Sequence, residues 1–250
     1  MSVASISRWH DDALVPLEYC EMSDSSMVAA DSWFVNDGRV LAIGLHRERF
    51  LNNAPGAESF WDAVIDAIPK HGDWFPRVEQ HSNGRLVFRL RTAPERQRTA
   101  VLATWNGREP RTQPGVKGPD LGAMLRIRSA VQPLGASEAV ILSEDGLVVE
   151  GAYSGLLWWR GDILCGPPTD LPRVNSVTTR SALTLATALG LDTHEEAVTP
   201  GELDGTELWV LSALHGIRIA TAWVDGPELA EQPGRLAAWQ ARLDTLRRAI

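Results

Sequence analysis

The sequence predicts a protein of mixed α and β structure, of the α/β (α+β) class, folded in two domains. Short strand-like apolar runs alternate with a few segments whose apolar residues recur at helical spacing. A run rich in glycine and proline, NGREPRTQPGVKGP (residues 106–119), separates the two halves. We therefore expect an N-terminal domain over residues 1–112, a linker over 113–118 and a C-terminal domain over 119–250.

In the N-terminal half, the clearest element is a hairpin that turns at Asp37-Gly38, because this pair supplies the positive φ of a tight turn. A second helix is expected to begin with Ser59 as its N-cap. No period is visible in residues 1–15, and the small polar segment 23–31 is expected to be a loop. The expected strands are 17–20, 33–35, 39–43, 86–90 and 99–105, and the expected helices are 45–54 and 59–68.

In the C-terminal half, helical spacing and strand-like runs alternate. Gly190 is in place to end the second helix. The expected helices are 121–131, 177–189 and 235–248, and the expected strands are 139–142, 147–149, 156–159, 162–164, 208–212 and 217–223. Ten tryptophans are spread over the whole chain, and we expect them to fill cores and interfaces.

Composition narrows the class of protein. Apolar residues make up 44% and charged residues 22%, as in an ordinary globular protein, and a net charge of −8 argues against nucleic-acid and membrane partners. Asp11 and Asp12 stand where a signal peptide would need apolar residues, and no eighteen apolar residues occur in succession. Neither the histidines nor Cys20 and Cys165 have metal-ligand spacing. We expect a cytoplasmic protein without a metal.

Only two of the 24 basic residues are lysines, Lys70 and Lys117. Lys117 follows Pro114-Gly115 at the expected domain junction, where ligand clefts tend to form. Desolvation there would lower the pKa of its amine, so that the neutral form could attack a carbonyl. The alternative is a solvated loop lysine.

A carboxylate and a helix start follow this lysine. Glu150 ends an apolar strand, where it is either buried against a cationic partner such as a protonated pyridine nitrogen or exposed at the strand end. Residues 176–180 open a helix with small polar side chains, and such a start offers N–H groups and positive dipole to an anion. Arg49 could grip the same anion, or it could be an exposed helix arginine.

Together these residues resemble the class IV, branched-chain-aminotransferase-like family of pyridoxal-phosphate enzymes, nearest its 4-amino-4-deoxychorismate lyase branch. The family order of lysine, helix, turn and glutamate is matched by Lys117, residues 123–131, residues 143–146 and Glu150. Three further segments are similar to family motifs. They are 174–180 for the phosphate-binding helix start, 207–217 for the acidic strand and second phosphate loop, and 31–49 for G-D-G-x-F followed by H-x-x-R.

The resemblance implies fold type IV, with a small N-terminal α/β domain, a C-terminal pseudo-barrel domain, the cofactor in the cleft and a homodimer. It makes Lys117 the Schiff-base lysine and catalytic acid/base, and Glu150 the partner of the ring nitrogen. For the rest of the cofactor it implies Arg49, Val177, Thr178, Thr179, Ser212 and Ala213. Candidate residues for a small amino substrate are Met27, Arg111, His215 and Arg218, where both arginines are chosen on charge alone.

Several positions depart from the family pattern. Leu121 and Gly122 replace the tyrosine of aminotransferases, Met27 replaces the catalytic threonine of lyases, and Gly155 replaces an asparagine. Ala30 and Ser32 also stand in place of glycines. The first hypothesis is a lyase that forms 4-aminobenzoate and pyruvate. The alternatives are an aminotransferase acting on D- or branched-chain amino acids and a degenerate relative that only binds.

Overall fold

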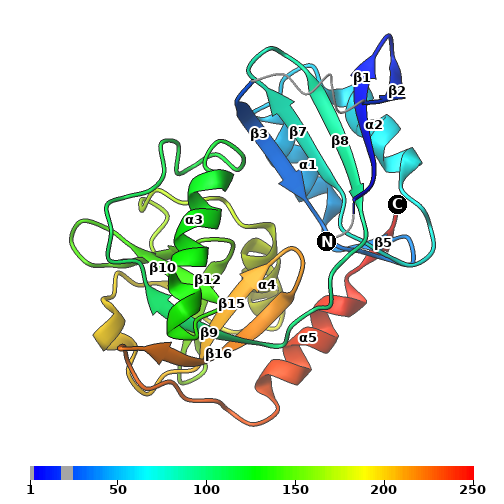
Figure 1. Ribbon diagram of the computed structural model, residues 1–250. Helices are drawn as coiled ribbons and strands as arrows, with labels where there is room; N and C mark the ends of the chain where they lie inside the picture. Colours follow the sequence, from blue (N-terminus) through cyan, green and yellow to red (C-terminus); the bar gives the residue numbers. More distant parts are fainter. Residues whose placement is uncertain (1–2, 18–24) are drawn as a thin grey trace. The chain divides into compact units, whose positions relative to one another are not determined.

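The computed structural model describes residues 3–17 and 25–250, and the chain divides into two compact units (Figure 1). The first unit comprises Met1–Arg96, Val116–Pro119 and Leu246–Ile250, and the second comprises Gln97–Gly115 and Asp120–Thr245. This division differs from the boundary expected after residue 112. The strand that begins at Thr99 pairs with strands of the second unit, whereas the segment around Lys117 returns to the first.

An antiparallel five-stranded sheet forms the centre of the first unit, in the order β2-β1-β8-β7-β3. Residues 3–16, where no period was visible, form a hairpin that turns at Asp11 and Asp12. The loop expected at 23–31 is wrong over residues 27–31, which belong to β3 and whose small residues are buried without alternation; residues 23 and 24 lie outside the described part of the chain. The expected strand at 17–20 falls largely outside the described residues. The strands are β1 (Val3–His10), β2 (Ala13–Pro16), β3 (Met27–Ser32), β7 (Arg77–His81) and β8 (Leu86–Arg91).

Two helices, α1 (Ile43–Leu51) and α2 (Glu58–Ala67), pack on one face of this sheet (Figure 1). Both expected helices are confirmed, but α2 begins one residue early and has Ala57, not Ser59, before its first turn. The core under the helices contains Trp33, Phe50, Phe60, Trp61, Val78 and Phe88.

A small four-stranded sheet completes the first unit, in the order β17-β5-β4-β6. The expected hairpin is confirmed, because Asp37 (φ 44°) and Gly38 (φ 69°) form its turn. The last residues described join this sheet as β17, so the helix expected over 235–248 ends at Thr245. The strands are β4 (Val35–Asn36), β5 (Arg39–Val40), β6 (Asp73–Trp74) and β17 (Arg248–Ala249).

A curled eight-stranded sheet forms the second unit, in the order β11-β10-β9-β16-β15-β12-β13-β14. The expected C-terminal strands are confirmed, with ends that differ by one or two residues. Its strands are β9 (Thr99–Thr104), β10 (Glu138–Leu142), β11 (Val148–Gly151), β12 (Gly155–Arg160), β13 (Ile163–Gly166), β14 (Thr193–Glu195), β15 (Leu208–Ser212) and β16 (Gly216–Val224).

The helices of this unit are α3 (Leu121–Val131), α4 (Val177–Ala188) and α5 (Arg235–Thr245), with short 3-10 turns η2 (Gln132–Leu134) and η3 (Pro200–Leu203). Trp209 of β15 packs edge-to-face on Trp159 and Trp239, with ring centroids 5.2 and 5.3 Å away. Trp33, Trp61, Trp158 and Trp209 are fully buried, so the expectation that tryptophans fill cores is confirmed for these four.

Replacing Trp209 by alanine should remove the centre of this cluster. We expect the free energy of unfolding of the second unit to fall by about 3–5 kcal/mol, because a buried aromatic is lost and a cavity remains. Urea titration followed by circular dichroism measures the change. Leu125→Ala, at a side chain that is 55% exposed, is the matched control and should change it far less. Equal losses in the two variants would contradict the cluster's role.

Candidate active site

In the first unit, three side chains from β3 and α1 meet in a buried cluster. Asp31 lies one residue before the end of β3, and His46 and Arg49 lie one turn apart on α1, so both reach the same carboxylate. Arg49 donates from Nε to Asp31 Oδ2 (2.7 Å) and from Nη2 to Oδ1 (2.8 Å), and His46 Nδ1 lies 2.8 Å from Oδ1. The bidentate pair fixes the guanidinium in one orientation.

The charges in this cluster are set by burial and by each other. Burial alone would raise the pKa of Asp31, but the charges of Arg49 and His46 outweigh it and hold the pKa well below its ordinary value. Burial lowers the pKa of His46; Asp31 opposes this shift, and Arg49 and Lys117 add to it. Asp31 is therefore ionised, and the charge of Lys117 lies close enough to His46 to lower its pKa.

The segment that carries Lys117 is held against β3. Ala30 N–H donates to the carbonyl of Lys117 (2.7 Å). Gly118 has φ 137°, and a Cβ there would come within 2.6 Å of Ala30 N, so only glycine fits this close approach. The side chain of Lys117 is partly buried. Met27, at the start of β3, is half-buried.

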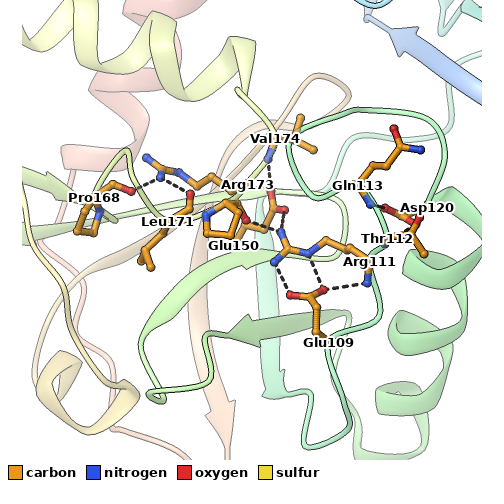
Figure 2. Close-up of polar contacts among 11 residues, drawn as sticks. Glu109, Arg111, Thr112, Gln113, Asp120, Glu150, Pro168, Leu171, Arg173 and Val174 are labelled. Atoms are coloured by element: carbon orange, nitrogen blue, oxygen red, sulfur yellow. Dashed lines mark hydrogen bonds and ion pairs between the residues drawn. The ribbon is translucent and has the colours of Figure 1, made fainter.

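In the second unit, Glu150 is buried, with 6% of its surface exposed, and it is paired with Arg111 (Figure 2). Arg111 Nη1 donates to Glu150 Oε1 (2.5 Å), and Val174 N–H donates to Oε2 (3.3 Å). The interpretation of Glu150 as an exposed strand end is therefore wrong.

Arg111 is itself enclosed by acceptors. It forms a bidentate pair with Glu109 (2.7 and 2.8 Å) and donates to Pro172 O (2.9 Å) as well as to Glu150. Burial lowers the pKa of Arg111, but hydrogen bonds to Glu109 and the charges of both glutamates raise it above its ordinary value. Four of its donor contacts are thus used within the unit, which gives this side chain the role of orienting Glu150.

A second carboxylate, Asp120, closes the loop that carries Lys117 (Figure 2). It accepts from Thr112 N–H (2.9 Å), Thr112 Oγ1 (2.8 Å) and Gln113 N–H (2.9 Å), so residues on either side of the loop are tied together. Sequence reasoning missed Asp120 and Glu109. The sequence signal for Asp120 was its position just before α3, where an aspartate ordinarily caps the helix. In the structure its side chain makes no cap hydrogen bond and binds Thr112 and Gln113 instead.

The start of α4 has the features of an anion cradle. Ser176 Oγ accepts from Thr179 N–H (3.3 Å), and the N–H groups of Val177 and Thr178 have no acceptor within the helix. Thr179 Oγ1 is buried and has no partner among the described residues, and a Cβ on Gly155 would lie 2.3 Å from it. The surrounding cavity, of about 440 Å³, is lined by Gly155, Arg173, Ser176, Thr179, Arg180 and His194 among others.

The turn between β15 and β16 carries the remaining expected residues. His215 N–H donates to Ser212 Oγ (3.2 Å), and Gln97 N–H donates to His215 Nδ1 (3.0 Å), which fixes the turn that contains Ala213. Arg218 is 4% exposed and pairs with buried Glu138 (3.4 Å). Its assignment to a substrate carboxylate stays a prediction, and the structure gives it an internal partner.

The expected site residues thus fall into two sets. The first unit holds Met27, Arg49 and Lys117, and the second holds the rest. Within residues 3–17 and 25–250, no group of three metal-ligating side chains occurs and no helix is long and apolar enough to cross a bilayer.

Breaking the pair in the second unit should leave a buried, uncompensated carboxylate. We expect Arg111→Gln to lower the free energy of unfolding by about 3–5 kcal/mol, and Arg111→Gln/Glu150→Gln to be more stable than the single variant. Urea titrations of the full double-mutant cycle measure this. Arg108→Gln, an exposed neighbour, is the control. A double variant less stable than Arg111→Gln would contradict the pairing.

Asp31 should give the first unit a stability that depends on pH. Since its pKa is lowered in the folded chain, its contribution is present above the ordinary value of 3.8 and is lost as the pH falls below it. Asp31→Asn should therefore be less stable than the natural chain at pH 7, by about 3–5 kcal/mol, with a smaller difference at pH 3. Asp66→Asn, exposed on α2, serves as control. A difference independent of pH would count against an ionised pair.

Comparison with known protein families gives one match, to the amino-transferase class IV family, over residues 29–223. This range includes every expected site residue except Met27. No curated protein matches the chain.

Among solved structures, the chain is similar to a branched-chain aminotransferase from Thermoproteus uzoniensis (TM-score 0.82, 20% identity, 97% of this chain and 94% of that one). It is similar to a PLP-bound hypothetical aminotransferase from Mycobacterium tuberculosis (0.80, 16%, 97% and 98%). A Legionella pneumophila protein provisionally named 4-amino-4-deoxychorismate lyase also matches (0.76, 15%, 87% and 90%). The expected fold type IV architecture is confirmed by these likenesses, and the chain belongs to the class IV aminotransferase family of pyridoxal-phosphate-dependent enzymes.

Proposed function

We propose that the chain is a pyridoxal-phosphate-dependent lyase that converts 4-amino-4-deoxychorismate into 4-aminobenzoate and pyruvate. The proposal rests first on the fit between the chain and the cofactor. The phosphate needs N–H and hydroxyl donors, and the start of α4 offers two N–H groups free of helical acceptors together with the unpartnered Thr179 hydroxyl. The ring nitrogen needs an oriented carboxylate, and Arg111 orients Glu150.

Arg49, fixed by Asp31, would grip the phosphate, and Val177, Thr178, Thr179, Ser212 and Ala213 would add donors to it. Glu150 would accept a hydrogen bond from the protonated ring nitrogen and so keep that nitrogen protonated. When bound, the cofactor supplies an electron sink for the reacting carbon.

Lys117 would then move the protons of the reaction. Its amine would take the proton from the ring carbon that bears the substrate's amino group, while the bond from the adjacent carbon to the enolpyruvyl oxygen breaks. The departing enol gains a proton and leaves as pyruvate, and the ring becomes aromatic. The balance needs no oxidant or second substrate. Proton transfer by a positioned side chain contributes about 10²–10⁴-fold to a rate.

The observation that favours the lyase is the start of α3, where Leu121 and Gly122 offer no phenol in place of the aminotransferase tyrosine. The phenol of Tyr153 donates to the carbonyl of Leu121 (3.4 Å), which occupies it within the second unit. In this proposal Lys117 works without the tyrosine that the aminotransferase pattern places at the start of α3.

A second candidate is amino transfer by the same residues. It is favoured by the TM-scores of 0.82 and 0.83 to branched-chain aminotransferases, against 0.76 to the Legionella protein, and by Met27 in the place of the lyase threonine. Incubation with 4-amino-4-deoxychorismate separates the two. Pyruvate and 4-aminobenzoate released without an added keto acid support the lyase, whereas product that forms only with 2-oxoglutarate removes it. A homodimer belongs to the same proposal and is measured by light scattering.

The scarcity of lysine gives a direct test of Lys117. We expect the purified protein with added pyridoxal phosphate to be yellow, and reduction with borohydride to leave the cofactor on the peptide that contains Lys117, as measured by mass spectrometry. Lys70 is exposed and is the only other lysine, so Lys70→Ala should keep the adduct and the activity. Lys117→Ala should lose the adduct and lower kcat by about 10²–10⁴-fold. A colourless natural protein, or an adduct on Lys70 alone, would contradict the proposal. It would favour the alternative of a degenerate relative that binds a ligand without catalysis.

A further inference from the structure

One face of the five-stranded sheet in the first unit carries more positive charge than its own residues neutralise. In an antiparallel sheet, residues directly opposite each other share a face, and alternate residues along a strand do too. Arg77 of β7 lies opposite Arg89 of β8 and opposite Ser32 of β3. Glu79 and Arg91, two residues along their strands, lie on the same face. The other face, with Val78 and Phe88, packs on the helices.

Three guanidinium groups lie around one carboxylate on this face, and two of them contact it. Glu79 is fully buried and contacts Arg77, Arg89 (2.7 Å) and His81 (3.1 Å). Arg91 donates to Phe75 O (2.9 Å) and Ser32 Oγ (3.2 Å), which are uncharged. Counting only Arg77, Arg89, Arg91 and Glu79, the group has an excess of two positive charges.

Without a bound anion, these neighbouring positive charges destabilise the folded unit. Like charges directly across a sheet destabilise it, as Arg77 and Arg89 do here. Burial, with the nearby charges of Arg77 and Arg89, lowers the pKa of Arg91 to about 10 despite Glu79. Arg77 Nε is buried and has no hydrogen-bond partner in the described part of the chain. The side chains of Arg77 and Arg89 are still 25% and 15% exposed, so a ligand can reach them.

The two arginines first assigned to substrate carboxylates are occupied elsewhere, since Arg111 holds Glu109 and Glu150 and Arg218 holds Glu138. Guanidinium groups recognise carboxylates through paired, parallel hydrogen bonds, and two carboxylates would match the excess charge. We propose that Arg77, Arg89 and Arg91 form a binding site for a substrate with two carboxylates. This inference rests on the proposed function, deepens it by naming the substrate class, and holds for lyase and aminotransferase alike.

The test compares two probes that cannot react with the cofactor. By isothermal titration calorimetry on the full chain, we expect isophthalate to bind about tenfold more tightly than benzoate, and added salt to weaken it. Arg77→Gln and Arg89→Gln should each weaken isophthalate about tenfold. Arg47→Gln removes the same charge from α1, on the other face of the sheet, and should leave binding unchanged. Equal binding of the two probes, or an equal loss in Arg47→Gln, would overturn the inference.

Glu79→Gln gives the sharpest outcome, because binding and stability should change in opposite directions. Burial alone would raise the pKa of Glu79, but hydrogen bonds from His81 and Arg89 and the charge of Arg77 lower this pKa to about 2. Its stabilisation is therefore present above the ordinary value of 4.5 and is lost as the pH falls toward 2. The variant should unfold more easily at pH 7, yet bind isophthalate severalfold more tightly, because Arg77 and Arg89 are released.

Circular dichroism confirms that each variant is folded before binding is measured. Weaker binding by folded Glu79→Gln would mean that the arginines serve the sheet alone and would overturn the site. Lys117→Ala should bind isophthalate normally, so loss of the trapped cofactor adduct and loss of this site are separate results.

Discussion

The ion pair between Arg111 and Glu150 is the contact on which the candidate chemistry of the second unit depends. Glu150 lies on a strand whose neighbours are apolar, and a carboxylate in such a place is tolerated only with a partner. The partner comes from the Gly/Pro-rich segment before α3, so one interaction orients the carboxylate and anchors that segment. Glu109 forms a second, bidentate ion pair with the same guanidinium, so two carboxylates enclose one arginine.

The same logic recurs in the first unit, with a different result. Asp31 holds Arg49 as Glu150 holds Arg111, but around Glu79 the count is unequal. Where each arginine is paired with a carboxylate, as Arg49 and Arg111 are, the interaction is internal to the fold. Where three arginines lie around one glutamate, positive charge is in excess, and this difference distinguishes the arginines that orient buried carboxylates from those proposed to bind a ligand.

Much of the fold could be predicted from the sequence, because most elements have local signals. The helix Leu121–Val131 has apolar residues at a clear period, and the hairpin at Asp37-Gly38 is set by two adjacent residues. Strand β3 could not be predicted, since residues 29–32 are small and are all buried, so no alternation marks the strand. β1 gave no signal because its exposed and half-buried residues do not alternate in character.

The candidate site residues follow the same rule: those with a local signal could be predicted, and those set by distant contacts could not. Lys117, Glu150 and the helix start at Ser176 follow one another along the chain, so order and spacing were enough to single them out. The partners of Arg111 and Arg218 are set by pairing between distant strands and loops, and charge alone assigned both arginines to a substrate. The arginine face of β7 and β8 arises only once the register of the sheet is known.

The tight approach of Gly118 to β3 also limits how this protein could change. A side chain at that position would collide with the backbone of Ala30, so an amine cannot shift one residue toward the C-terminus without rebuilding the strand contact. The position of Lys117, the proposed reactive lysine, is therefore fixed by Gly118. Directed evolution toward new reactions would have to leave Lys117-Gly118 intact and vary the residues around it.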